Sequence, residues 1–142
     1  LGVQILPNQS LEIERDGERL TIIGIEDPLI GKEPQQMLDE AMATVDDKSF
    51  KILLSHRPEI FETYVENTID VVFTGHAHGG QIRLPFIGGL FAPGQGWLPN
   101  KTSGVYEADE TKMIISRGLG NSVLKQRLFN LPEIVIVDLK AQ

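Results

Sequence analysis

Two short apolar runs on either side of a helical pattern constrain the fold more than any other feature of this sequence. The runs are residues 50–54 (FKILL) and 70–73 (DVVF), each of a length typical of a strand buried on both faces. Between them, residues 58–65 place four apolar side chains on one face of a helix that begins near Pro58. A strand, a helix and a second strand in this order predict a crossover unit, and therefore an α/β fold built on a parallel sheet.

The rest of the chain supplies further strands and one more helix. Asp16-Gly17 is typical of a hairpin turn, and apolar residues at helical spacing follow Pro34. The additional elements that we expect are a hairpin of residues 11–15 and 20–25, a helix over 34–45, a hairpin of 104–108 and 112–116, and a final strand over 133–139 (EIVIVDL).

Residues 79–104 interrupt this pattern with seven glycines, three prolines and no periodicity. Loops of this length in compact domains are usually functional or disordered, and the aromatic residues here argue against disorder. Residues 84–91 (LPFIGGLF) form an apolar part of this loop. We expect that part to pack onto Trp97 and the sheet, and contact with a membrane or a lipid tail is the alternative.

Composition excludes several classes of protein. The net charge of −7, from 20 acidic and 13 basic residues, argues against nucleic-acid binding because it repels the phosphate backbone. The absence of cysteine excludes disulfides, thiolate metal sites and a cysteine nucleophile. No apolar run approaches the roughly 18–20 residues that span a bilayer. We expect a cytoplasmic protein, or one peripheral to the membrane if an anchor lies upstream. Because the chain opens at Leu1, we also expect it to be a piece of a longer protein.

All three histidines lie at the ends of predicted strands. His56 follows FKILLS, and His76 and His78 follow DVVFTG. The carboxyl ends of parallel strands form the crevice in which α/β proteins bind ligands. Residues at i and i+2 of an extended segment point the same way, so His76 and His78 can converge on metal ions. A single histidine is more often a hydrogen-bonded structural residue, but the combined pattern favours metal ligation.

The segments around these histidines resemble the last two motifs of calcineurin-like metallophosphoesterases. The resemblance is carried by residues 53–58 (LLSHRP) and 73–81 (FTGHAHGGQ), and residues 82–106 resemble a bacterial branch of that family. Some members of that branch are membrane-associated, and relatives cleave phosphodiesters or lipid-linked pyrophosphates. The resemblance extends over residues 11–139. It implies that residues 1–142 are the C-terminal portion of one domain, half of a four-layer α/β/β/α sandwich.

The resemblance also implies a site with two divalent ions, of Mn, Fe or Zn. His56 and His76 would ligate one ion and His78 the other. The family's site activates a water for in-line attack on phosphorus and stabilises the charge that develops on the phosphoryl oxygens. The substrate would be a phosphorylated small molecule or lipid.

The family's other ligands are absent from this sequence. Its D-x-H, G-D and G-N-H motifs, which supply carboxylate and asparagine ligands, have no counterpart here. Without carboxylates, two neighbouring dications repel each other strongly, so the isolated chain is expected to hold at most one ion and to be inactive. A sheet edge exposed by the missing half invites homodimerisation.

Four further residues are candidates for substrate contact. A guanidinium binds phosphate with two hydrogen bonds, which suggests this role for Arg57, Arg83 and Arg117, each with a structural ion pair or loop contact as the alternative. Asn121, in a segment that resembles a late part of the same branch, is the fourth.

Two other functions remain open from the sequence. The first is a non-catalytic metal-binding module that uses the three histidines for structure or regulation. The second is a hydrolase of the metallo-β-lactamase type, which normally needs H-x-H-x-D-H. Gly80 and Gln81 occupy the last two positions of that motif here, which argues against it.

Overall fold

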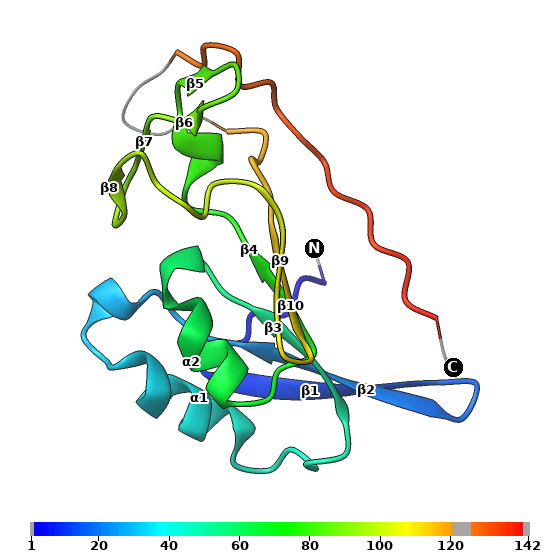
Figure 1. The fold of residues 1–142 in the computed structure, drawn as a ribbon. Coiled ribbons are helices and arrows are strands. Elements are labelled where there is room, and N and C mark those ends of the chain that lie inside the picture. Colours follow the sequence, from blue (N-terminus) through cyan, green and yellow to red (C-terminus); the bar gives the residue numbers. More distant parts are fainter. Residues whose placement is uncertain (1, 121–125, 141–142) are drawn as a thin grey trace.

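The computed structural model describes residues 2–120 and 126–140, and its centre is a mixed sheet of six strands (Figure 1). The strands lie in the order β1-β2-β3-β4-β10-β9, and the inner pairings from β2 to β10 are all parallel. The two edge strands, β1 and β9, are antiparallel to their neighbours. The six strands are β1 (Gln9–Arg15), β2 (Glu18–Gly24), β3 (Phe50–Leu54), β4 (Val71–Thr74), β9 (Gly104–Ala108) and β10 (Thr111–Ile115).

Two α-helices connect the parallel strands as the sequence predicts. They are α1 (Pro34–Met42) and α2 (Phe61–Glu66), and the turn η2 (Pro58–Ile60) leads directly into α2. The predicted helix over 34–45 ends three residues early, because the chain tightens there into a turn in which the Val45 N–H donates to Met42 O at 3.0 Å. Within the described residues, no helix is long and apolar enough to cross a bilayer.

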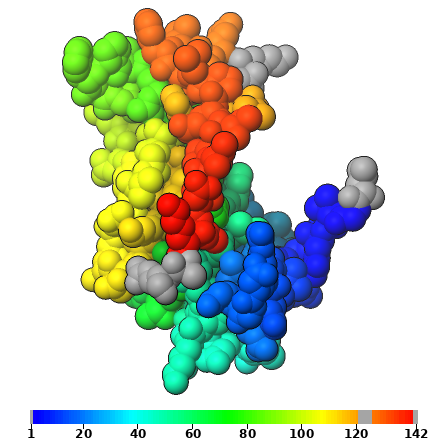
Figure 2. All heavy atoms as spheres, turned by 90° about the vertical axis from the view of Figure 1, so that its right-hand side faces the viewer, coloured from blue at the N-terminus to red at the C-terminus, as the bar shows by residue number. Residues whose placement is uncertain are grey.

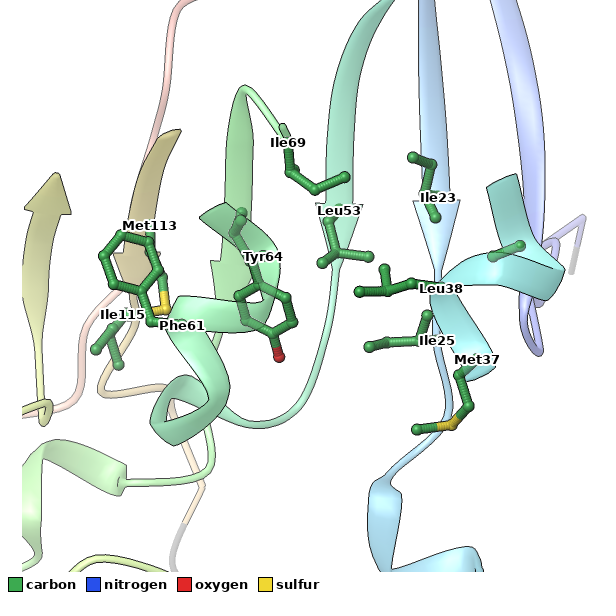
Figure 3. Close-up of a cluster of buried hydrophobic side chains, with 12 residues drawn as sticks. Ile23, Ile25, Met37, Leu38, Leu53, Phe61, Tyr64, Ile69, Met113 and Ile115 are labelled. Atoms are coloured by element: carbon green, nitrogen blue, oxygen red, sulfur yellow. The ribbon is translucent and has the colours of Figure 1, made fainter. Parts of the chain in front are cut away.

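The main core lies between these helices and one face of the sheet (Figure 3). Leu38 of α1 and Tyr64 of α2 are fully buried against the strand residues Ile23, Leu53 and Met113. Successive strand residues point to opposite faces, so each strand gives about half of its side chains to this core. Burial of these apolar side chains is the main stabilising contribution to the fold.

The opposite face of the sheet has a smaller apolar cluster. Ile52, Val71 and Ile114 are buried there, while Phe50 and Leu54, which point the same way as Ile52, are 40% and 45% exposed. In the part of the chain that the structure describes, both α-helices pack on the other face. The α/β class is therefore confirmed, and the described residues build two layers, one helical and one of sheet.

Residues 131–140 run as an extended segment outside the sheet (orange to red in Figures 1 and 2). Neither open edge strand, β1 nor β9, pairs with this segment. The prediction of a final strand over 133–139 is therefore wrong for this structure, and Ile134 and Ile136 are 74% and 85% exposed. An alternating apolar pattern indicates that a segment can form a strand, but a ladder also needs a partner edge, which the pattern cannot reveal.

The long glycine-rich loop is ordered by two minimal hairpins side by side. The N–H of Leu90 donates to Ile82 O at 2.8 Å and the N–H of Leu98 donates to Leu90 O at 2.9 Å, and these bonds join the hairpins. The four short strands are β5 (Arg83–Leu84), which pairs with β6 (Gly88–Gly89), and β7 (Phe91–Ala92), which pairs with β8 (Gly96–Trp97).

The apolar part of this loop does not pack as expected from the sequence. Phe91 and Trp97 contact each other with ring centroids 5.7 Å apart, but Phe86 is completely exposed and Ile87 is 61% exposed. The Ile87 N–H donates to Leu84 O at 3.2 Å and closes a turn at whose tip these two side chains lie. The expectation that residues 84–91 cover Trp97 and the sheet is therefore wrong for Phe86 and Ile87.

Replacement of Tyr64 by Phe tests how the core supports the chain after β3. The buried Tyr64 hydroxyl donates to Arg57 O at 2.7 Å and shares a second 2.7 Å bond with Ser55 Oγ. We expect Tyr64→Phe to lower the free energy of unfolding by about 1–3 kcal/mol, because it leaves a buried carbonyl without its donor. Urea denaturation measures this change.

Tyr106→Phe is the matched control. The Tyr106 hydroxyl also donates to a backbone carbonyl, Asn100 O at 2.7 Å, but at an exposed position where water can replace it. We expect a loss below about 1 kcal/mol for this variant. Equal losses for the two variants would contradict the role assigned to Tyr64.

Candidate metal centre

The parallel pairing of β3 with β4 brings two histidine segments to the same edge of the sheet. Leu54 lies opposite Phe73 in the register, so each chain leaves the sheet at the same level. The Ser55 N–H donates to Phe73 O at 3.0 Å, which continues the ladder by one bond beyond β3. His56 and His76 each follow two residues after the last residue of their strand.

His56 and His76 lie against each other at this edge. Nε2 of His56 is 2.8 Å from Nδ1 of His76, and the ring centroids are 4.5 Å apart. This distance corresponds to a hydrogen bond between one protonated and one unprotonated ring nitrogen. Two imidazole nitrogens so close together can also bind a single ion, because bonds from zinc to imidazole nitrogen are about 2.0–2.1 Å long.

His78 follows in the turn η3 (His78–Gly80) and does not complete a three-residue ligand group. Across residues 2–120 and 126–140, no three His, Asp or Glu side chains gather closely enough to hold a metal ion. The structure therefore brings together two of the three predicted ligands. That pattern is compatible with the resemblance, which assigns His78 to a different ion from His56 and His76.

Burial and nearby positive charge favour the neutral form of His76 and His78. Burial lowers the pKa of His76, and the charges of Arg57 and His56 lower it further. Burial also lowers the pKa of His78, with added effects from Arg127 and His56. A neutral imidazole is the form that binds a metal ion, so the electrostatics of the site favour ligation.

Asp27 belongs to the same site and was missed from the sequence. Its Oδ2 lies 3.7 Å from His56 Nε2, and its two oxygens accept from Arg57 Nε at 2.9 Å and Nη2 at 3.3 Å. Burial alone would raise the pKa of Asp27, but the hydrogen bonds from Arg57 and the Leu29 N–H, with the charge of Arg57, lower it, so the carboxylate is ionised. Asp27 follows the carboxyl end of β2, and the rule that pointed to the histidines could have found it.

The segment that carries His76 and His78 has a strained backbone. His76, His78 and Gln81 all have positive φ angles, of 40°, 46° and 53°. Residues other than glycine rarely adopt this conformation, and each instance costs on the order of 1–3 kcal/mol. Such a conformation persists only where surrounding contacts fix it, and strain of this kind is concentrated at functional sites.

Asn130, which the sequence analysis did not identify, fixes this strained turn. The side chain is 2% exposed, and its amide donates to His78 O at 2.6 Å and to Gln81 O at 3.0 Å. Arg83 adds a bond from Nη1 to Gly79 O at 2.9 Å. Asn130, distant in the sequence, and the neighbouring Arg83 together hold the backbone of the histidine turn.

Two glycines in this turn are required by close contacts. Gly79 has a φ of 68°, and a Cβ there would collide with Asn130 and lie 2.9 Å from Arg117 Cγ. Gly80 touches Gly89 of β6, where an added Cβ would lie 2.8 Å from Gly80 Cα. Only glycine allows both the backbone conformation and the packing.

The structure gives different environments to the residues considered for substrate contact. Arg57 is 8% exposed and bound to Asp27 and Glu59, and Arg117 pairs with Glu133 at 3.1 Å. Arg83 instead bonds neutral groups, namely Gly79 O, Thr102 Oγ1 and Ser103 Oγ. Asn121 lies outside the described residues.

The types of donor at this edge are compatible with a divalent ion, but the described residues supply only a part of a ligand set. Two imidazole nitrogens, with an ionised carboxylate next to one of them, are ligand types that Zn, Fe and Mn accept. Nε2 of His76 is buried and has no hydrogen-bond partner among the described residues, while Nδ1 faces His56. A neutral His76 with its proton on Nε2 thus presents an unprotonated nitrogen to the position that an ion would share with His56.

Comparisons with known proteins find relatives of one class of hydrolase. The chain is 32% identical over 126 residues to YkuE, a metallophosphoesterase of Bacillus subtilis (strain 168), which covers 89% of this chain and 42% of that protein. It is 28% identical over 138 residues to the phosphodiesterase YaeI of Escherichia coli (strain K12), and the match covers 97% of this chain and 48% of YaeI. It is 30% identical over 146 residues to LpxG of Chlamydia muridarum (strain MoPn / Nigg), a UDP-2,3-diacylglucosamine pyrophosphatase, covering 94% and 40%.

This chain matches the C-terminal part of a metallophosphoesterase. It spans about half the length of these curated relatives or somewhat less. No protein-family profile and no solved structure matches it. The relatives are named as hydrolases of phosphoester or pyrophosphate bonds, and metallophosphoesterases use divalent metal ions.

Replacement of Asn130 by Ala tests whether the strained turn sets the metal affinity. We expect the variant to bind Mn²⁺ or Zn²⁺ about tenfold or more weakly, because loss of a residue that orients metal ligands typically costs 10–100-fold in affinity. Isothermal titration calorimetry measures the affinity.

Asn67→Ala is the matched control for this experiment. The Asn67 amide also donates to a carbonyl, Thr63 O at 2.8 Å, but at the end of α2 away from the histidines. It should lower the stability of the protein and leave the metal affinity unchanged. Equal affinities for the Asn130 variant and the unmodified protein would contradict the role of Asn130.

Proposed function

We propose that the whole protein hydrolyses phosphoester, phosphodiester or pyrophosphate bonds at a site with two divalent metal ions. In this proposal, residues 1–142 form the C-terminal portion of the catalytic domain. His56 and His76 hold one ion, and His78 contributes to the other. The ions, of Mn, Fe or Zn, would activate a water for attack on phosphorus and stabilise the charge on the phosphoryl oxygens.

The contact between His56 and His76 is the observation that carries this proposal. Their ring nitrogens lie 2.8 Å apart at the carboxyl edge of a parallel sheet, although 19 residues separate the two histidines in the sequence. The strained turn held by Asn130 adds support, because a fold that maintains strain at a pair of histidines is unusual without a function. The names of the relatives agree with phosphate chemistry.

The second ion requires ligands that the described residues do not gather. Carboxylates offset the repulsion between two neighbouring dications, and within the described ranges no group of three acidic or histidine side chains forms. We propose that the remaining ligands come from the part of the whole protein that corresponds to the other half of the relatives. The face of the sheet opposite the helices, where Phe50 and Leu54 are partly exposed, would pack on this other half of the protein. The two halves would then complete a four-layer sandwich.

Of the residues considered for substrate contact, Arg83 is the one that we propose for a phosphate oxygen. It forms no salt bridge with a carboxylate among the described residues, and it already bonds Gly79 O next to His78. Arg57 and Arg117 are held in ion pairs, so we assign them to positioning the loops. The proposed substrate is a phosphorylated small molecule or lipid.

Replacement of His78 by Ala in the whole protein tests the two-metal proposal. We expect hydrolysis of bis-(p-nitrophenyl) phosphate to fall by at least about 100-fold, because the loss of a ligand removes an ion that stabilises developing charge. Bound metal, measured by mass spectrometry, should fall from two ions to one. Removal of metal with a chelator should abolish turnover, and addition of Mn²⁺ should restore it.

A non-catalytic metal-binding module gives the opposite result. In that case His78→Ala would reduce the amount of bound metal without changing turnover. The variant and the unmodified protein would hydrolyse the diester at the same rate, or neither would hydrolyse it. His78→Gln, which keeps a polar side chain of similar length, controls for local unfolding, and its melting temperature should equal that of the unmodified protein.

The isolated chain supplies a further test of the division of ligands. We expect residues 1–142 alone to bind at most one ion and to show no metal-dependent hydrolysis above background. The open edges of β1 and β9 expose unpaired backbone groups, so we also expect concentration-dependent dimerisation in size-exclusion chromatography. Two bound ions with full activity would overturn the proposal that half of the ligands lie elsewhere.

A further inference from the structure

An exposed apolar surface projects from the same end of the molecule as the histidine turn. We call it the apolar tip. Phe86 at its centre is fully exposed, and the side chains around a hollow of about 540 Å³ next to it are mostly apolar. The residues of the apolar tip are Leu84, Pro85, Phe86, Ile87 and Phe129.

The conformation of the tip shows that the fold holds these side chains outward. Phe86 has a φ of 68°, which is costly for a bulky residue, and Phe129 has a φ of 53°. The backbone bond from Arg83 N–H to Leu128 O at 3.0 Å ties the two parts of the tip together. The neighbouring hairpin adds Trp97 and Leu98, which are 77% and 62% exposed.

Charge around the tip differs from that of the rest of the protein. Of the basic residues in segments 71–106 and 113–132, Lys101 and Arg117 form salt bridges with Glu62 and Glu133. Arg83 and Arg127 instead bond carbonyls and hydroxyls, and neither forms a salt bridge within the described residues. The apolar tip therefore lies beside two arginines that no ion pair holds in this part of the chain.

We propose that the apolar tip docks the protein on the surface of a bilayer that contains anionic lipids. Phe86 and Ile87 would enter the interface between headgroups and acyl chains, where aromatic and aliphatic side chains are stabilised. Arg83 and Arg127 beside them would face anionic headgroups, which attract basic side chains near such a surface. The histidine turn touches β6 through Gly80 and Gly89, so docking would place this turn close to the lipid headgroups.

Vesicle sedimentation of the whole protein tests this inference. The vesicles contain phosphatidylcholine alone, or phosphatidylcholine with phosphatidylglycerol. We expect binding to the second kind, weakened by added salt because the charge contribution is screened. The double variant Phe86→Ser, Ile87→Ser should bind at least about tenfold more weakly, since it removes two apolar side chains from the interface.

The double variant Leu29→Ser, Ile30→Ser is the matched control. These adjacent residues, 80% and 71% exposed in the turn η1 (Pro28–Ile30), lie in a segment rich in acidic residues. This variant should bind vesicles like the unmodified protein. Both double variants should keep the melting temperature. The variant Phe86→Ser, Ile87→Ser should also keep the hydrolysis of a water-soluble diester, which tests the hydrolase proposal separately because the docking inference does not rest on it.

Three results would overturn the inference. The first is no binding of the unmodified protein to vesicles with anionic lipid. The second is equal binding by the two double variants. The third is protection of a Phe86→Cys thiol from maleimide in the absence of vesicles, which would mean that another part of the whole protein, or a second copy, covers the tip.

Discussion

The parallel pairing of β3 with β4 is the constraint on which the rest of the site depends. Because the two strands run in the same direction in register, the residues that follow them leave the sheet side by side, and His56 meets His76. An antiparallel pair would place the two histidines at opposite edges. The same direction of β2 brings Asp27 to this edge, where its carboxylate holds Arg57 and lies near His56. One topological choice thus assembles three polar residues from three separate strand ends.

Packing of the strands cannot by itself fix the turn that follows β4. Three residues other than glycine adopt positive φ angles between His76 and Gln81, and their combined cost is several kcal/mol. The compensation comes from two side chains: Asn130, distant along the chain, binds two carbonyls of the turn, and Arg83, which follows the turn, binds a third. These bonds hold the backbone of the segment that carries His78, and a fixed backbone is what a preorganised ligand site requires.

The sequence predicts the parts of this structure that depend on local patterns. Apolar runs and turn residues give the inner strands, both helices and both hairpins, and the carboxyl-end rule places His56, His76 and His78 near one edge. Asp27 was accessible to the same rule, because it follows the carboxyl end of β2. Asn130 carries no local signal, because its function lies in a contact across about fifty residues. The prediction of a strand over 133–139 was wrong, because an alternating pattern indicates that a segment can pair but does not show which strand it would pair with.

The contact between Gly80 and Gly89 gives the molecule a mechanical property. Two backbones that touch without side chains between them couple the hairpin of β5 and β6 closely to the turn of His78. The fold therefore sets the distance from the ring of Phe86 to the imidazole of His78. On the docking proposed above, this distance would set the height of the histidine turn over the bilayer surface, and a longer or shorter hairpin would change that height.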